Sequence, residues 1–128
     1  ALAIRPGKSV MPFGTPGGDN QNQANVQVML NMELFGMNPQ EAAEAPRFMT
    51  HSQPNSFSPH EAYPGKLTME GRIDEATGEE LARRGHDVER MADMTWKTAG
   101  VCLVRKDLKT GIIDSGADPR RPSRAMGR

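Results

Sequence analysis

The longest stretch with a helical pattern covers residues 20–35. At 100° per residue, its polar side chains fall on one narrow stripe, and apolar side chains cover most of the remaining circumference. The stripe consists of Asn20, Gln23, Gln27 and Asn31. A surface helix has a wide polar face, so the pattern predicts a helix packed between two layers, capped by Asp19 or Asn20 and ended by Gly36. Glu33 falls on the apolar side, where it either needs a partner or reaches water at an edge.

A short second helix is predicted over residues 39–45, because Asn38 is a good capping residue and Pro39 suits the first helical position. The following stretch, residues 47–64, has no steady period and is interrupted by prolines. It is interpreted as an extended segment that crosses the surface.

A third helix is expected to start near Asp74. The spacing of Thr77 and Glu80 is that of a capping box, which predicts reciprocal hydrogen bonds at the N-terminus of this helix. Gly85 is expected to end it, because glycine adopts the left-handed conformation that commonly follows a helix.

Strands are predicted where short apolar or alternating runs lie between turn-forming residues. These runs are residues 1–4, 9–13, 67–73, 87–91, 99–105 and 111–115. The first two flank a Pro-Gly turn, and the last two are expected to pair as a hairpin. Together with the helices, they predict an α+β fold with a largely antiparallel sheet.

Composition limits the classes of function. The 128 residues carry a formal net charge of zero, which removes the simplest argument for a nucleic-acid partner. No apolar run approaches the roughly 20 residues that span a bilayer, so no membrane span is expected. Aromatic residues make up only 5% and the mean hydropathy is −0.64, values low enough to suggest that other protein completes the core.

Several residues are of types that serve as nucleophiles or metal ligands, but their spacing does not match a known site. Cys102 is the single cysteine and stands in an apolar run, so it is interpreted as a small core residue. The three histidines, His51, His60 and His86, are too scattered for a zinc site. The serines near His51 do not form a recognisable triad. The tail over residues 118–124 is interpreted as an irregular basic end, a solvated tail packed on a neighbouring strand. The alternative is a weak anion patch formed by the arginines at 120, 121 and 124.

Residues 14–18, Gly-Thr-Pro-Gly-Gly, connect a predicted strand to the start of the longest helix. Backbone N–H groups in such a loop, beside the positive end of a helix dipole, favour a negative oxygen. A phosphate loop is disfavoured, because Asp19 and Asn20 stand where a Walker loop needs Lys and Ser or Thr. An oxyanion hole and a purely structural turn both stay open on this evidence.

The same loop belongs to a series of motifs that resembles a known family. The other members of the series are residues 35–38, 40–47, 84–86 and 118–121. In this order and at similar spacing, they resemble the C-terminal part of the small subunit in the γ-glutamyltransferase (γ-glutamyltranspeptidase) family. The resemblance covers nearly the whole chain, and the combination of motifs is specific although no single motif is.

The resemblance implies an N-terminal-nucleophile hydrolase with an αββα sandwich, made as a precursor that cleaves itself into two subunits. It implies that the N-terminal threonine of the small subunit attacks the γ-glutamyl amide of glutathione or a related compound, with its own amino group as base. The acyl group then passes to water or to an amino acid or peptide acceptor. The resemblance assigns the oxyanion-binding N–H groups to Gly17 and Gly18, and it implies no cofactor or metal.

In the family, the threonine motif and the residues that bind the glutamyl group lie well upstream of the glycine loop, whereas 13 residues precede Gly14 here. Thr50 and His51 superficially resemble the nucleophile motif but lie downstream of the loop, so they are rejected. Residues 1–128 are therefore expected to be a single C-terminal piece of the small subunit without its nucleophile. Alone, this piece should be inactive, expose apolar surface and self-associate.

Its expected partners are a small γ-glutamyl substrate, the large subunit and the N-terminal segment of the small subunit. A related acylase, a poly-γ-glutamate-processing enzyme and a non-catalytic interaction domain with the same fold are the alternatives. The resemblance suggests a periplasmic or secreted protein, and the sequence leaves a cytoplasmic location open.

Overall fold

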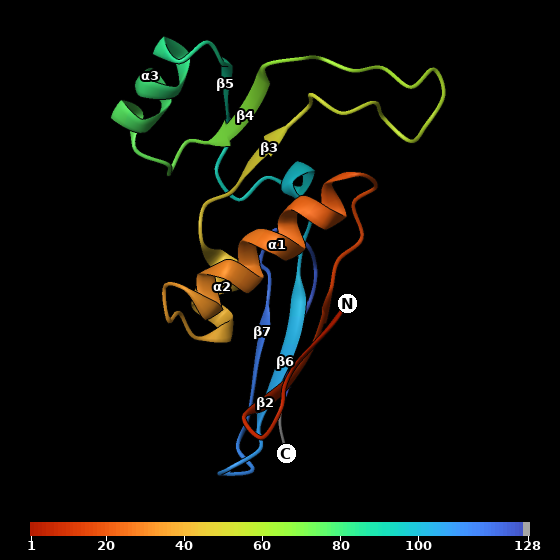
Figure 1. Cartoon of the computed structure of the whole chain (residues 1–128), viewed down its shortest axis with the longest axis vertical. Helices are drawn as coiled ribbons and strands as arrows, with labels where there is room; N and C mark the ends of the chain where they lie inside the picture. Colours follow the sequence, from red (N-terminus) through yellow and green to blue (C-terminus); the bar gives the residue numbers. More distant parts are fainter. Residues whose placement is uncertain (127–128) are drawn as a thin grey trace.

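A computed structural model of the chain describes residues 1–126. It contains two β-sheets, one at each end of an elongated molecule, with helices beside both (Figure 1). The larger sheet has the order β1-β2-β6-β7, and every neighbouring pair is antiparallel. Its strands are β1 (Leu2–Arg5), β2 (Ser9–Gly14), β6 (Cys102–Asp107) and β7 (Ile113–Ala117). The predicted hairpin is thus confirmed as β6–β7, with both strands starting two or three residues later than expected.

The smaller sheet has the order β3-β4-β5, with β3 antiparallel and β5 parallel to the central strand. Its strands are β3 (Phe48–Thr50), β4 (Lys66–Glu70) and β5 (Asp87–Met91). The parallel pair is connected through α3 (Glu75–Arg83), because parallel neighbours need a crossover connection. Strand β3 lies inside the stretch that the sequence predicted as an extended surface segment. The α+β prediction is confirmed, with four antiparallel pairings and one parallel pairing.

Two helices cover one face of the larger sheet (Figure 1). They are α1 (Asn20–Glu33) and α2 (Pro39–Glu44). The core between these helices and the sheet consists of Met11, Ala24, Val28, Met32, Ala42, Ala43, Ala99, Val101 and Leu103. Small residues at α2 let it approach the sheet closely, and a side chain at Gly116 of β7 would collide with the backbone of Pro39.

The predicted cap of α2 is confirmed, whereas that of α3 is wrong. The Asn38 side chain accepts a hydrogen bond from the Glu41 N–H, and the Glu41 carboxylate accepts one from the Asn38 N–H, both at 2.9 Å. Helix α3 starts at Glu75, three residues earlier than a Thr77 cap requires, and its N-cap Asp74 makes no side-chain cap bond. Glu80 instead pairs with arginines in the last turn of α3.

The polar stripe of α1 faces β3 rather than solvent. Gln23 accepts a hydrogen bond from the Thr50 N–H at 2.9 Å and donates one to the Thr50 carbonyl at 3.1 Å. Gln27 pairs with both backbone groups of Phe48 in the same way. Two glutamines one helical turn apart therefore satisfy the free edge of β3 and connect the two parts of the molecule.

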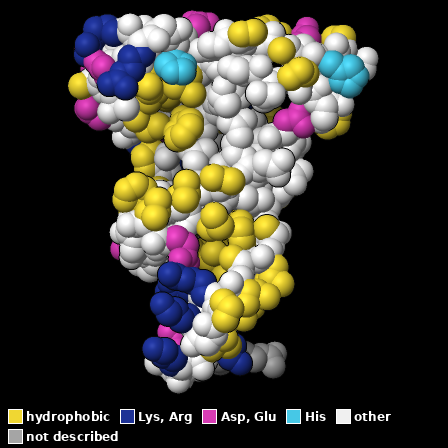
Figure 2. All heavy atoms as spheres, viewed as in Figure 1, with side chains coloured by type: hydrophobic (Ala, Val, Ile, Leu, Met, Phe, Trp, Pro, Cys, Tyr) yellow, Lys and Arg dark blue, Asp and Glu magenta, His cyan; other side chains and the backbone are white. Residues whose placement is uncertain are grey.

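The apolar side of α1 is partly uncovered. Val26 is 49% exposed, and Leu34 and Phe35, just after the helix, are 70% exposed. Glu33 has a partner, because its carboxylate lies 2.5 Å from the guanidinium of Arg5. Within residues 1–126, α1 is covered by a layer on one side only, and hydrophobic side chains are visible over it in Figure 2.

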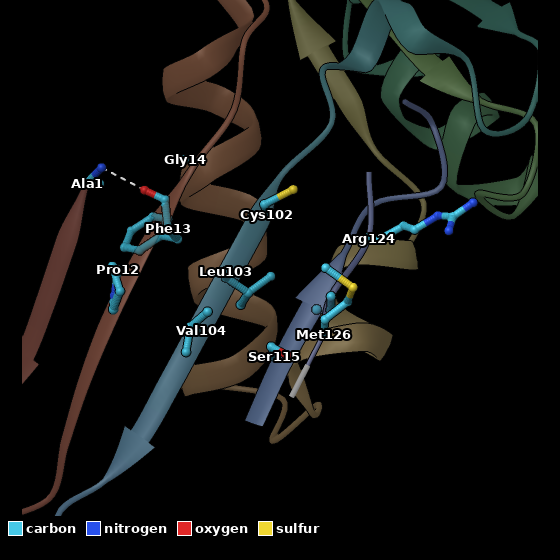
Figure 3. A pocket seen from close by; sticks show the side chains of 12 residues that line it. Ala1, Pro12, Phe13, Gly14, Cys102, Leu103, Val104, Ser115, Arg124 and Met126 are labelled. Atoms are coloured by element: carbon cyan, nitrogen blue, oxygen red, sulfur yellow. Dashed lines mark hydrogen bonds between the residues drawn. The ribbon is translucent and has the colours of Figure 1, made fainter. Parts of the chain in front are cut away.

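The face of the larger sheet opposite the helices is also apolar and uncovered. Leu2, Ile4, Val104 and Ile113 are exposed on it. Cys102 shares this face and is exposed, so its assignment to the core is wrong. A shallow pocket of about 610 Å³ lies here, lined by side chains of β2 and β6 and by Met126 (Figure 3). In the described part of the chain, no helix is both long and apolar enough to cross a membrane.

Candidate active site

The glycine loop, residues 14–18, leads from the end of β2 into α1. Gly17 and Gly18 have φ angles of +146° and +57°, which residues with a side chain rarely adopt. Their carbonyls accept hydrogen bonds from Asn20 and Gln21 at 3.2 and 3.1 Å, which starts the helix. Within residues 1–126, the N–H groups of Gly17 and Gly18 donate to no protein acceptor. Two adjacent free donors therefore lie at the positive end of α1.

A second turn, residues 98–101, supports the glycine loop from behind. A β-carbon at Gly17 would lie 3.0 Å from the β-carbon of Ala99, closer than nearly all real contacts of this kind. Ala99 itself is fully buried and has φ +70°, a strained value for alanine. The Gly100 N–H donates to Thr15 Oγ1 at 2.7 Å, which ties the turn to the loop. The position of the two free N–H groups thus depends on the turn.

Four charged side chains form a buried ionic cluster behind this turn: Arg47, Glu70, Asp118 and Arg120. Arg120 donates to both carboxylate oxygens of Glu70, at 2.6 and 2.7 Å, and to Asp118 at 3.0 Å. Arg47 lies 2.5 Å from the other oxygen of Asp118. Two positive and two negative charges thus compensate one another away from water.

This ionic cluster binds both ends of the 98–101 turn. Arg47 donates to the Thr98 carbonyl at 3.0 Å, and the Thr98 hydroxyl donates to Glu70 at 3.0 Å. At the other end, the Val101 N–H donates to Asp118 at 3.1 Å. A continuous series of bonded groups therefore runs from the cluster through the turn to the glycine loop.

The electrostatics of the cluster keep its members charged. Burial alone would raise the pKa of Glu70, but the hydrogen bonds and charge of Arg120 outweigh burial and lower that pKa. Burial lowers the pKa of Arg47, and the charge of Asp118 opposes this effect. For Arg120, the pKa is raised because Glu70 and Asp118 outweigh its burial. The expectation of a solvated basic tail is therefore wrong for Asp118 and Arg120, which are buried structural charges.

On its open side, the glycine loop borders a cleft of about 550 Å³. The opposite wall belongs to the 51–64 loop, defined as residues 51–64, which lies on the same side of the molecule as the start of α1 (Figure 1). The sequence suggested Asp19 as a cap of α1, but its side chain makes no capping hydrogen bond. Its carboxylate instead accepts hydrogen bonds from the N–H and hydroxyl of Ser56, at 2.7 and 2.5 Å, and these bonds lower its pKa.

The three histidines lie apart from one another and do not form a common site. His51 Nε2 lies 3.0 Å from the Thr68 hydroxyl, and burial together with the charge of Lys66 lowers its pKa. His60 lies at the tip of the 51–64 loop, and His86 is exposed before β5. Among residues 1–126, no three His, Cys, Asp or Glu side chains are grouped so that they could bind a metal ion.

The chain matches the Gamma-glutamyltranspeptidase family over residues 1–128. It is 32% identical over 127 residues to the Glutathione hydrolase-like YwrD proenzyme of Bacillus subtilis (strain 168), covering 99% of this chain and 23% of that protein. It is 30% identical over 119 residues to the Oxamate amidohydrolase proenzyme of Klebsiella pneumoniae, covering 92% of this chain and 21% of that protein.

The fold is shared with solved structures. Superposition on the structure of LmbA2991HD gives a TM-score of 0.82 at 36% identity, over 93% of this chain and 21% of that chain. The chain thus spans about a fifth of the length of these relatives. These structures share the α+β fold of the chain, in which α1 and α2 cover one face of the larger sheet. With a match over all 128 residues, the chain belongs to the gamma-glutamyltranspeptidase family.

Proposed function

We propose that this chain is part of an enzyme that cleaves the γ-glutamyl amide of glutathione-like compounds. The observation that supports this most directly is the pair of free N–H groups at Gly17 and Gly18, in a chain of this family. In the proposal these groups bind the oxyanion of the tetrahedral intermediate. The nucleophilic threonine belongs to a segment upstream of this chain, and the remaining small-subunit and large-subunit segments complete the site.

The reaction has two steps. The threonine hydroxyl adds to the γ-carbonyl carbon as its proton moves to the threonine amino group, and the carbonyl oxygen becomes an oxyanion at Gly17 and Gly18. The C–N bond then breaks, the leaving amine takes that proton, and a γ-glutamyl ester of threonine remains. Water attacks the ester to release glutamate, or an acceptor amine attacks it to form a new γ-glutamyl amide; either restores the threonine hydroxyl.

The geometry suits this role because the donors are fixed before substrate binds. Gly17 is confined by Ala99, and the turn that contains Ala99 is bonded to the buried ionic cluster. Preorganised donors need no rearrangement as the negative charge develops, and loss of one typically costs about 3 kcal/mol of transition-state stabilisation.

A second candidate activity is hydrolysis of a different amide, supported by the 30% identity to the Oxamate amidohydrolase proenzyme. The oxyanion role of Gly17 and Gly18 is the same for both activities, since each passes through a tetrahedral intermediate at an amide carbonyl. The two differ in the acyl group, which the upstream segments are expected to bind. The acyl group therefore has to be determined with the full-length protein.

The test uses full-length protein with γ-glutamyl-p-nitroanilide, glutathione and oxamate as substrates. Release of p-nitroaniline and of cysteinylglycine, with oxamate left intact, supports the γ-glutamyl activity; cleavage of oxamate alone replaces it with the second candidate. Gly18→Val should lower turnover about 100-fold or more, because it strains the backbone and displaces a donor. Gly111→Val is the matched control, because Gly111 also has a positive φ, +76°, but lies in the β6–β7 turn. An equal loss in both variants would remove the oxyanion role.

A further inference from the structure

The cleft beside the glycine loop is bordered by two segments of the chain. Gly17 and Gly18 form one end of its wall, and the 51–64 loop forms the opposite side. Any carbonyl oxygen bound by the Gly17 and Gly18 N–H groups would therefore have this cleft next to it. The lining nearest the glycines determines which part of a substrate fits there.

Hydrogen bonds fix the 51–64 loop to the start of α1. The Ser56 N–H and hydroxyl both donate to the carboxylate of Asp19, the residue directly after the two glycines. The loop is also closed internally, since the Asn55 N–H donates to the Glu61 carbonyl and the His60 N–H to the Phe57 carbonyl, at 2.8 and 2.7 Å. The cleft is thus largely preformed.

Phe57 supplies the apolar surface closest to the glycine loop. A ring carbon of Phe57 lies 3.3 Å from the position that a β-carbon on Gly18 would occupy. The side chain is nevertheless 65% exposed, so most of the ring is free to contact another group. An exposed aromatic ring fixed beside a free backbone donor is suited to packing against an apolar or flat substituent.

The charged groups of the cleft exclude one class of ligand. Two carboxylates line it, Asp19 and Glu61, and among its lining residues, all within the described chain, there is no Lys or Arg. His51 also lines the cleft, but burial and the neighbouring Lys66 lower its pKa and so favour its neutral form. A substrate carboxylate placed here would meet negative charge and no positive partner.

We propose that the cleft binds the amine side of the scissile amide, and that Phe57 favours amines with an apolar or aromatic substituent over amines that carry a carboxylate. The glutamyl side carries an α-carboxylate and needs a cation, which this cleft does not offer. The leaving amine occupies the cleft in the first step, and the acceptor amine occupies it in the second. This assignment rests on the proposed function and adds the substrate class to it.

The test compares two donors that share the glutamyl group and differ in the leaving amine. γ-Glutamyl-p-nitroanilide releases an uncharged arylamine, whereas glutathione releases cysteinylglycine, which carries a carboxylate. In the full-length enzyme, Phe57→Ala is expected to lower the ratio of kcat/KM for the anilide to kcat/KM for glutathione about tenfold, because it removes apolar contact with the aryl group only. Phe57→Leu should retain most of this ratio.

Glu61→Lys provides an independent second variant, because it places a cation in the cleft without altering the apolar wall. It is expected to raise kcat/KM for glutathione several-fold and leave that for the anilide nearly unchanged. The control is Phe35→Ala, since Phe35 is also exposed but lies beyond the other end of α1, and its ratio should equal that of the wild type.

The outcomes separate the two proposals. The assignment of the cleft would be overturned if Phe57→Ala changed kcat/KM equally for both donors and Glu61→Lys left kcat/KM for glutathione unchanged. Cleavage of both donors by the wild type would still uphold the proposed function. A wild-type protein that cleaves neither donor would overturn both.

Discussion

Arg120 and Glu70 form a bidentate ion pair in the interior of the molecule, with N–O distances of 2.6 and 2.7 Å. The two residues lie 50 positions apart in the sequence. Both side chains are fully buried. Glu70 ends β4 of the smaller sheet, and Arg120 follows β7 of the larger sheet. The pair therefore connects the two sheets directly behind the turn that supports the glycine loop.

Removing one member of this pair should strongly destabilise the protein. Glu70→Ala leaves Arg120 with one carboxylate in place of two, and an uncompensated buried charge typically costs about 3–5 kcal/mol. We expect a markedly lower midpoint for Glu70→Ala in denaturant unfolding of the full-length protein. Glu89→Ala removes a carboxylate from an exposed pair with Lys66 and should leave the midpoint nearly unchanged. Similar midpoints for the two variants would contradict the importance of the buried pair.

Acid should remove the contribution of Glu70. The pKa of Glu70 is lowered in the folded protein relative to its ordinary value of 4.5, so the ionised form stabilises the fold above that value. This contribution is lost as pH falls through the folded-state pKa, below 4.5. We expect the difference in Tm between wild type and Glu70→Gln to be largest above pH 5 and to shrink as pH falls below 4.5. A difference that stays constant over this range would argue against ionised Glu70.

The ionic cluster also illustrates why part of the site is not readable from the sequence. Local patterns mark residues 118–124 as a basic, turn-rich end, and in most proteins such a segment is solvated. Whether Asp118 and Arg120 are buried depends on Arg47 and Glu70, which reach them only in the folded chain. The motif resemblance included Arg47 and the Asp118–Arg121 segment, and that was the one signal of a special role.

Other features followed their local pattern more closely. The glycine loop was predictable because positive φ angles before a helix require glycine, and residues 20–35 showed a helical period. The same period could not show that Gln23 and Gln27 pair with β3, since the partner is the backbone of a strand that has no sequence pattern of its own. For Cys102, the run of apolar residues indicated burial, whereas alternation along β6 places it on the uncovered face.

The contact between Gly17 and Ala99 predicts a compensating pair of substitutions. Gly17→Ala would put two β-carbons 3.0 Å apart and displace the glycine loop, so kcat for γ-glutamyl-p-nitroanilide should fall about 100-fold. Ala99→Gly removes one of the two β-carbons and also relieves the strained φ of +70°. The double variant should recover part of the lost activity, because φ +146° at Gly17 still disfavours alanine.

Steady-state kinetics of both single variants and the double variant would check this coupling in the full-length enzyme. Ala99→Gly alone is expected to retain most of the activity, since the turn stays bonded at Thr98, Gly100 and Val101. If the losses in the two single variants simply multiply in the double variant, the two residues are not coupled through this contact.

The uncovered face of the larger sheet predicts how residues 1–128 behave when produced alone. Leu2, Ile4, Val104 and Ile113 expose apolar surface there. The isolated chain should therefore self-associate and show no γ-glutamyl hydrolysis. Sedimentation velocity at low micromolar concentration should detect dimers or larger species, and Val104→Lys with Ile113→Lys should shift them toward monomer. Glu79→Lys is the control for a change of charge, because Glu79 is exposed on α3. A compact monomer of the unmodified chain would contradict the prediction, because it would show that the uncovered face of the larger sheet is stable in water.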